Sequence, residues 1–135
     1  MHGTWRRSVG LGVGVCTAVA MAAMATLLAR TLWPAYAAAE PSRAYSGAML
    51  IGRLLAGALC TAGAACAATR IAQDHGTVAW WLGGLFLGVS APHHLLQVWA
   101  AYPVWYHVVY LSYLVPIAGL TGQLASRSAP VSVFR

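Results

Sequence analysis

Residues 9–29 read VGLGVGVCTAVAMAAMATLLA, and this stretch decides the fold class. It lies between Arg7 and Arg30 and contains no charged side chain. A helix needs about 20 apolar residues to cross the roughly 30 Å hydrocarbon core of a bilayer. The stretch therefore predicts a membrane-spanning helix.

Three more apolar stretches of similar length follow it. The connections between them are short, except for the one from Arg30 to Tyr45. We therefore expect an all-α membrane protein, a four-transmembrane-helix bundle that forms a single integral membrane domain over residues 1–135. The first span is residues 9–29, and the other three are predicted at residues 48–69, 78–98 and 104–124.

The composition excludes the other classes of protein. Of 135 residues, 60% are hydrophobic and only 7% are charged, whereas roughly a quarter of a soluble domain is charged. Such an apolar chain does not stay disordered, and three cysteines are too few for a disulfide scaffold. The net charge of +6 does not indicate a nucleic-acid partner, because the arginines lie scattered at the ends of the apolar stretches.

The arginines predict the orientation in the membrane, because cytoplasmic loops carry an excess of Lys and Arg. With the N-terminus inside, five arginines fall on the inner side and two on the outer side. These are Arg6, Arg7, Arg70, Arg127 and Arg135 against Arg30 and Arg43. We therefore expect both termini in the cytoplasm. High alanine with no lysine is typical of a GC-rich bacterial genome, which favours a bacterial inner membrane.

Two features leave alternatives open. Arg6-Arg7 before an apolar stretch, with small residues before Glu40, is similar to a secretion signal, although the stretch exceeds the usual core of about 7–15 residues. The sequence Leu32-Trp33-Pro34-Ala35-Tyr36 is echoed by Trp99-Ala100-Ala101-Tyr102-Pro103. Two helical hairpins related by duplication would produce that echo.

Small residues recur at every fourth position in several spans, which lets two helix backbones approach closely. One row in the first span begins with Gly10 and Gly14, another in the second begins with Gly52, and Gly84 and Gly88 form a third. We expect these rows to pack the bundle, with a homo-oligomer contact as the alternative.

Arg53 is the one charged residue inside a predicted span. It follows Tyr45 by eight positions, which places it roughly 5–12 Å below the outer surface. Its helical neighbours are mostly small, so the guanidinium is expected to point into the bundle or up toward the interface. An ionisable residue in a span is a functional hypothesis, and snorkelling to headgroups is the alternative. Glu40 would be its only acidic partner on that side.

Tyr106, Tyr110 and Tyr113 share one helical face, at spacings of four and three. Such a face is typical of an aromatic packing ridge whose hydroxyls bond to other helices. With Arg53 and the histidines, the same face could line a polar pocket for a lipid headgroup, a quinone or a small anion.

His93, His94 and His107 form a second constellation. If the last two spans turn near Ala101, His94 and His107 are almost equidistant from the turn and face each other. We expect their imidazoles to form hydrogen bonds across the helices. A metal or haem site is the alternative, for which no third ligand is obvious.

The last 45 residues resemble a group of small bacterial four-span inner-membrane proteins. The resemblance is carried by Tyr102-Pro103-Val104-Trp105-Tyr106-His107, by Pro116 and Gly119, and by Gly122-Gln123-Leu124. It implies the same fold and no particular activity.

The sequence lacks the motifs of an enzyme. No Ser-His-Asp set or phosphate loop appears, and Glu40 and Asp74 fall on opposite sides of the membrane. We therefore expect no catalysis and no cofactor. The first hypothesis is an accessory protein that contacts itself or a larger membrane partner through its helix faces. The second is a carrier or channel subunit for a small anion, lipid or quinone, with Arg53, Tyr106, Tyr110 and Tyr113 lining the site. The third is a metal- or haem-binding redox protein that uses His93, His94 and His107.

Overall fold

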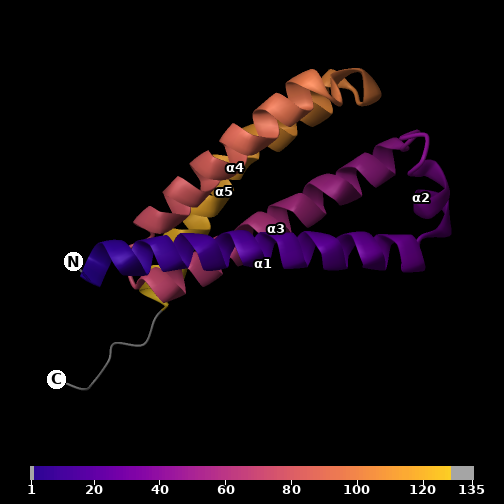
Figure 1. The fold of residues 1–135 in the computed structure, drawn as a ribbon. Helices are drawn as coiled ribbons and strands as arrows, with labels where there is room; N and C mark the ends of the chain where they lie inside the picture. Colours follow the sequence, from indigo (N-terminus) through magenta and orange to yellow (C-terminus); the bar gives the residue numbers. More distant parts are fainter. Residues whose placement is uncertain (1, 129–135) are drawn as a thin grey trace.

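The computed structural model describes residues 2–128, and every regular element in that range is helical (Figure 1). Arg135, which contributes to the predicted orientation, lies outside the described residues. The elements are α1 (His2–Leu32), α2 (Pro34–Ala39), α3 (Gly47–Ala72), α4 (Thr77–Leu96), the 3₁₀ turn η1 (Trp99–Ala101) and α5 (Val104–Arg127).

Three of the helices are long and apolar enough to cross a membrane, namely α1, α3 and α5. They contain the first, second and fourth predicted spans. The third predicted span corresponds to α4, which has 20 residues but is not among the three. The polar His93 and His94, together with Pro92, lower the mean hydropathy of α4. These lengths and this composition are those of a membrane protein.

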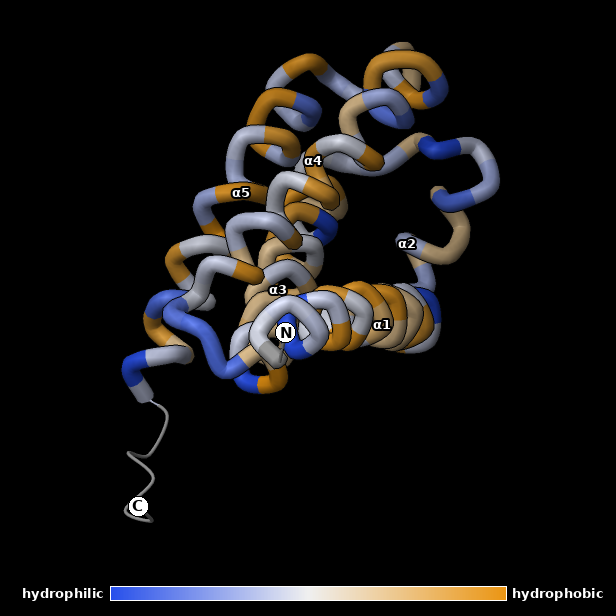
Figure 2. The backbone as a smooth tube through the Cα atoms, turned by 60° about the vertical axis from the view of Figure 1, so that its left-hand side comes forward, coloured by the Kyte–Doolittle hydropathy of each residue, from blue (hydrophilic) through white to orange (hydrophobic). Residues whose placement is uncertain are grey.

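The outward faces of the helices support that class. Only 6% of the most apolar part of α1 is buried inside the molecule. Leu27, Leu28 and Leu32 are all exposed, and Figure 2 shows hydrophobic positions along the outer turns of α1 and α5. A surface this apolar needs a covering, because monomeric soluble proteins rarely expose large hydrophobic patches.

The helices pack closely at one end and separate at the other. α3 lies in the middle, in contact with α1 and α5, and α4 packs along α5. α1 and α3 diverge toward the end where α2 joins them (Figure 1). We call the closely packed end, which contains the α3–α4 turn, the inner half, and the diverging end the outer half.

Small side chains hold the inner half together. Ala64, Ala68 and Leu82 are fully buried there. A Cβ added to Gly14 would lie 2.8 Å from a methyl carbon of Leu82, and one added to Gly10 would lie 2.7 Å from the Ala68 carbonyl. α1 can therefore approach α3 only because these positions carry no side chain.

The turn between α3 and α4 is fixed by polar contacts. Asp74 accepts hydrogen bonds from the backbone N–H groups of Gly76 and Val78, both at 3.0 Å, and so caps α4. Its carboxylate lies 3.4 Å from Arg7, and Arg6 donates to the side chain of Gln73. Gly76 has φ 89°, a left-handed conformation that suits glycine. α1 is thus tied to this turn.

The structure corrects two details of the sequence interpretation. The connection from Arg30 to Tyr45 contains the helix α2, because Pro34 ends α1 and begins a new helix. Trp33, just before it, takes the extended φ of −130° that precedes proline. In α4, Gly84 and Gly88 are exposed and a Cβ on either would meet nothing within 4 Å, so Gly83, not this row, packs against α5.

Candidate functional site: a cavity beneath Arg53

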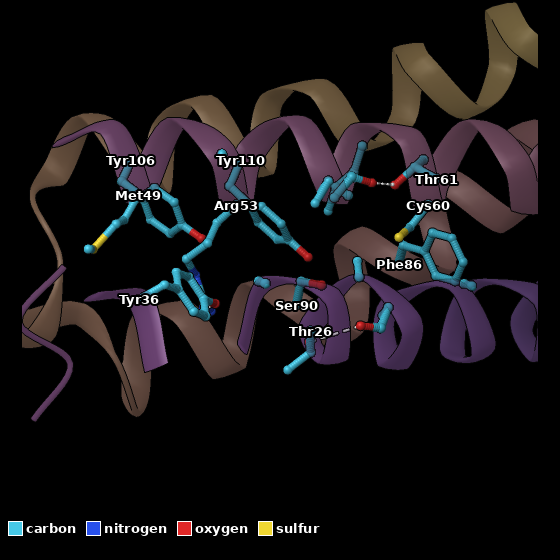
Figure 3. Close-up of a pocket in the computed structure, with 18 of the residues that line it drawn as sticks. Thr26, Tyr36, Met49, Arg53, Cys60, Thr61, Phe86, Ser90, Tyr106 and Tyr110 are labelled. Carbon is cyan, nitrogen blue, oxygen red and sulfur yellow. Dashed lines mark hydrogen bonds between the residues drawn. The ribbon is translucent and has the colours of Figure 1, made fainter. Parts of the chain in front are cut away.

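A cavity of about 400 Å³ lies between α1 and α3 where the two helices diverge (Figure 3). This volume is within the usual range of small-molecule sites, roughly 300–1,000 Å³. All four long helices and α2 contribute to its wall. Its wall includes Ala18, Ala22, Thr26, Trp33, Tyr36, Arg53, Cys60, Thr61, Phe86, Ser90, Tyr106, Tyr110 and Leu114.

Arg53 lines this cavity from α3. Its Nη1 donates to the Tyr36 hydroxyl at 2.6 Å and to the Tyr45 hydroxyl at 3.4 Å. Its guanidinium carbon lies 4.8 Å from the centre of the Tyr45 ring and 5.9 Å from that of Tyr102. The Nε is buried and has no hydrogen-bond partner in the described structure. The guanidinium thus points into the molecule, and one of its donors is unused.

Four tyrosines surround Arg53, and we call them the tyrosine cage: Tyr36, Tyr45, Tyr102 and Tyr106. Successive rings lie close together, with centroids 5.2 Å apart for Tyr36 and Tyr45, 6.0 Å for Tyr45 and Tyr102, and 5.1 Å for Tyr102 and Tyr106. Figure 3 shows the Tyr106 hydroxyl directed toward Arg53. Ring faces attract a cation, so the cage stabilises the positive charge without neutralising it.

Glu40, the one acidic residue that the sequence offers to Arg53 on the outer side, does not pair with it in the described structure. Glu40 pairs instead with Arg30, whose Nε and Nη2 donate to its two oxygens at 2.6 and 2.9 Å. The chain has two acidic residues, and the second, Asp74, pairs with Arg7. Within the described residues, no carboxylate is therefore left to balance Arg53. The short helix α2 explains the difference, because it turns Glu40 back toward the end of α1.

The pKa values of Glu40 and Tyr45 are shifted from their ordinary values. Hydrogen bonding to Arg30 lowers the pKa of Glu40, so this carboxylate stays charged and committed to its partner. Burial raises the pKa of Tyr45 to about 12. Tyr45 therefore stays protonated and offers Arg53 a neutral hydroxyl rather than a phenolate charge.

The three tyrosines of α5 divide between the cavity and the helix packing. Tyr106 and Tyr110 line the cavity, whereas Tyr113 does not. The Tyr113 hydroxyl donates to the Leu54 carbonyl at 3.1 Å, as expected for a packing ridge. Figure 3 shows the hydroxyls of Tyr110 and Ser90 directed into the cavity.

Beyond these hydroxyls the cavity wall becomes apolar. Its inner end is lined by Ala18, Cys60, Phe86 and Leu114. Thr26 and Thr61 also line it, but their hydroxyls donate to the carbonyls of Ala22 and Gly57 on their own helices, both at 2.9 Å. The cavity is therefore charged and aromatic at one end and apolar at the other.

The histidines form a separate pair next to the cage. His94 and His107 lie opposite each other as the spacing predicts, with their ring planes nearly perpendicular at 86° and their Nδ1 atoms 2.9 Å apart. The Nε2 of His107 is 3.3 Å from the Trp99 carbonyl. If His107 donates to that carbonyl, its Nδ1 accepts from His94. His93 does not join them, because its Nδ1 lies 3.1 Å from Gln97. No group of three or more metal-ligating side chains occurs in the described part of the chain.

The spacing of residues predicts Arg53 and Tyr106 as site residues but does not predict Tyr36, Tyr45 and Tyr102. A signal for two of them was present. Tyr36 and Tyr102 are the matching tyrosines of the two echoed segments, and both converge on Arg53, by hydrogen bond and by ring contact. The echo thus marks the two turns that close the cage.

No family model, curated protein sequence or solved structure matches the chain. The resemblance of the last 45 residues to small four-span proteins therefore stays an expectation. The functional argument depends on the geometry of the site.

Proposed function

We propose that the protein is a ligand-binding membrane subunit that takes up an anion in the Arg53 cavity, as a carrier or as part of a larger transport or sensing assembly. The single observation that carries this is the charge of Arg53. It faces a cavity of about 400 Å³ and has no carboxylate partner in the described residues. A charge in a span is costly, and a bound anion would offset that cost.

The proposal includes a topology. α4 is taken as a span in addition to α1, α3 and α5, since its 20 residues match the length that a bilayer requires. An even number of spans puts both termini on the same side of the membrane, and the arginine distribution favours the cytoplasmic side of a bacterial inner membrane. The tyrosines contributed by both turns support an origin of the two hairpins by duplication.

Reporter fusions test this topology. A periplasm-active reporter is expected to work in the loop around Arg43 and to fail at Ser128, while a cytoplasm-active reporter shows the opposite pattern. Activity of the periplasmic reporter at both sites would contradict α4 as a span, and activity at Ser128 with none around Arg43 would contradict the orientation.

Native mass spectrometry of the protein released from membrane nanodiscs tests the binding function. We expect the wild-type protein to retain an anionic molecule, and the Arg53→Gln variant to lose it. Arg43→Gln removes an exposed arginine of the outer loop and is the matched control that should retain it. The proposal is wrong if Arg53→Gln retains the same additional mass as the wild-type protein, or if the wild-type protein carries no bound molecule.

The accessory role is the competing proposal. It is favoured by the exposed row of Gly84 and Gly88 on α4, which nothing in the described structure covers and which suits close contact with another helix. An accessory subunit should co-purify with its partner equally well as wild type and as Arg53→Gln. The metal- or haem-binding role is a weaker third proposal, because the hydrogen bonds of the histidine pair leave only the Nε2 of His94 free.

A further inference from the structure

We infer that the ligand of this cavity is a single-chain amphiphile with a carboxylate head, of the fatty-acid class. The inference rests on the proposed function and adds the ligand's shape, its orientation and its route of entry. The head would lie at Arg53 and the chain would extend toward Phe86. Three independent features of the cavity lead to this ligand.

The first feature is the head site. Arg30 shows how a guanidinium of this protein binds a carboxylate, since its Nε and Nη2 take both oxygens of Glu40 at 2.6 and 2.9 Å. In Arg53 the Nη1 is occupied by tyrosine hydroxyls, while the Nε is buried and unpaired. The Nε is covered by its neighbours, with the Tyr106 hydroxyl directed toward the same side chain (Figure 3). A carboxylate entering from the cavity would displace that hydroxyl and then satisfy the Nε by the same two-bond geometry.

The second feature is the shape of the cavity. Along α3, the wall from Arg53 to Thr61 covers about 12 Å at the helical rise, which matches an alkyl chain on the order of ten carbons at bond lengths near 1.5 Å. A volume of about 400 Å³ over this length leaves room for one chain. The inner end offers aliphatic and aromatic side chains, and the Thr26 and Thr61 hydroxyls donate to their own helices.

The third feature is the entrance. Ala22 lines the cavity and is also exposed on the surface of α1. It lies near the middle of the first predicted span, so the opening faces the hydrocarbon of the bilayer. An anion dissolved in water would have to pass into the hydrocarbon to reach an opening at this depth, which is costly for a charge. An acyl chain is already dissolved there.

Photolabelling tests the inference with a dodecanoic acid that carries a diazirine at its chain end. The full-length protein is labelled in nanodiscs of zwitterionic lipid, and competition by unlabelled dodecanoate, acetate and dodecanol is measured. We expect the label on Phe86 and its neighbours at the inner end of the cavity. Dodecanoate should compete at least about tenfold better than dodecanol, since a charge-assisted pair is lost with the alcohol, and acetate should not compete.

Two variants with matched controls separate the head from the chain. Arg53→Gln should weaken dodecanoate competition about tenfold, to the level of dodecanol, while Arg43→Gln should not change it. Ala22→Phe fills the entrance and should abolish labelling of the inner end. Val19→Phe adds the same ring to an exposed position of α1 and should leave labelling intact. Arg53→Lys, which keeps the charge, checks that any loss is not unfolding, and it should retain part of the preference.

The outcomes distinguish the two levels of the argument. If acetate competes as well as dodecanoate, and Ala22→Phe has no effect on it, the anion site stands and the fatty-acid class is wrong. If dodecanoate and dodecanol compete equally in the wild-type protein, or Arg53→Gln changes nothing, the anion-binding function fails as well. If the label is found only on the surfaces of the helices that face away from the cavity, the fatty-acid inference is wrong and the proposed anion-binding function is unaffected.

Discussion

α1 and α3 face each other with rows of small residues along both the inner and the outer half of the molecule. The small residues serve opposite purposes in the two halves. In the inner half, Gly10 and Gly14 of α1 pack against the buried Ala64 and Ala68 of α3. The two backbones are so close that neither glycine position has room for a Cβ. In the outer half, the continuation of the same rows lines an open cavity. The row on α1 continues as Ala18, Ala22 and Thr26, and the row on α3 begins as Gly52, Ala56 and Cys60.

The inner and outer halves differ in the side chains that lie next to the rows of small residues, not in the rows themselves. α2 lies at the outer end, where α1 and α3 diverge (Figure 1). The aromatic cluster around Leu50, Leu54 and Tyr106 packs α3 against α5 there. The inner half is therefore held by packing and the outer half by aromatic and polar contacts. Small residues give close contact in one half and empty space in the other. The following predictions test this contrast, from the largest expected effect to the smallest.

Gly14→Leu should be the most damaging change. Its Cβ would already lie 2.8 Å from Leu82 and 3.0 Å from Ala68, and overpacking typically costs about 1–3 kcal/mol. We expect a loss near the upper end, about 3 kcal/mol, in the free energy of unfolding measured by SDS titration in mixed micelles. Gly12→Leu, where a Cβ meets nothing within 4 Å, is the control on the same helix. Equal losses in both variants would contradict the packed inner half.

His107→Leu should be the most damaging polar deletion in the outer half. His107 is 1% exposed, and its removal leaves the Nδ1 of His94 buried without its partner. Leaving a buried polar group unsatisfied costs about 1–3 kcal/mol, and the same titration measures it. His93→Leu removes an exposed ring bonded only to Gln97 and should change little. A stable His107→Leu variant would mean that apolar packing also holds this half.

Tyr113→Phe should cost less, about 1 kcal/mol, because it removes one hydrogen bond, to the Leu54 carbonyl. Tyr110→Phe is the matched control from the next turn of α5. It removes a hydroxyl that points into the cavity (Figure 3), so it should leave the unfolding midpoint unchanged. The reverse order of the two variants would show that the Tyr110 hydroxyl has a structural partner.

The pair of Arg30 and Glu40 should give the smallest effect, visible only as a pH dependence. Folding lowers the pKa of Glu40, so its contribution to stability is fully present above the ordinary glutamate pKa. It is lost as the pH falls from that value through the lowered one. The difference in unfolding midpoint between wild type and Glu40→Gln should therefore shrink over that window. A difference that stays constant from neutral pH into acid would mean that the carboxylate charge contributes nothing.

The sequence predicted those features that depend on local composition or on counting along a helix. Hydropathy alone located the cores of the long helices, and equal distance from a turn placed His94 opposite His107. The partner of Glu40 was not predictable in this way. It depends on how Pro34 breaks the chain and how α2 then turns it, which is a matter of three-dimensional path. Likewise Tyr36, Tyr45 and Tyr102 meet at Arg53 only because two separate turns reach the same end of the molecule.

The composition of the tyrosine cage has a consequence for the way the protein is made. Tyr36 and Tyr45 precede Arg53 in the chain, whereas Tyr102 and Tyr106 belong to the second hairpin and leave the ribosome later. During synthesis, the hairpin of α1 and α3 is therefore complete while Arg53 is only half enclosed. Until the second hairpin arrives, Arg53 depends on the hydroxyls of Tyr36 and Tyr45. A chain that stops after α3 would therefore hold Arg53 with half of the cage, and only the complete chain supplies the Tyr102 ring that also lies over its guanidinium.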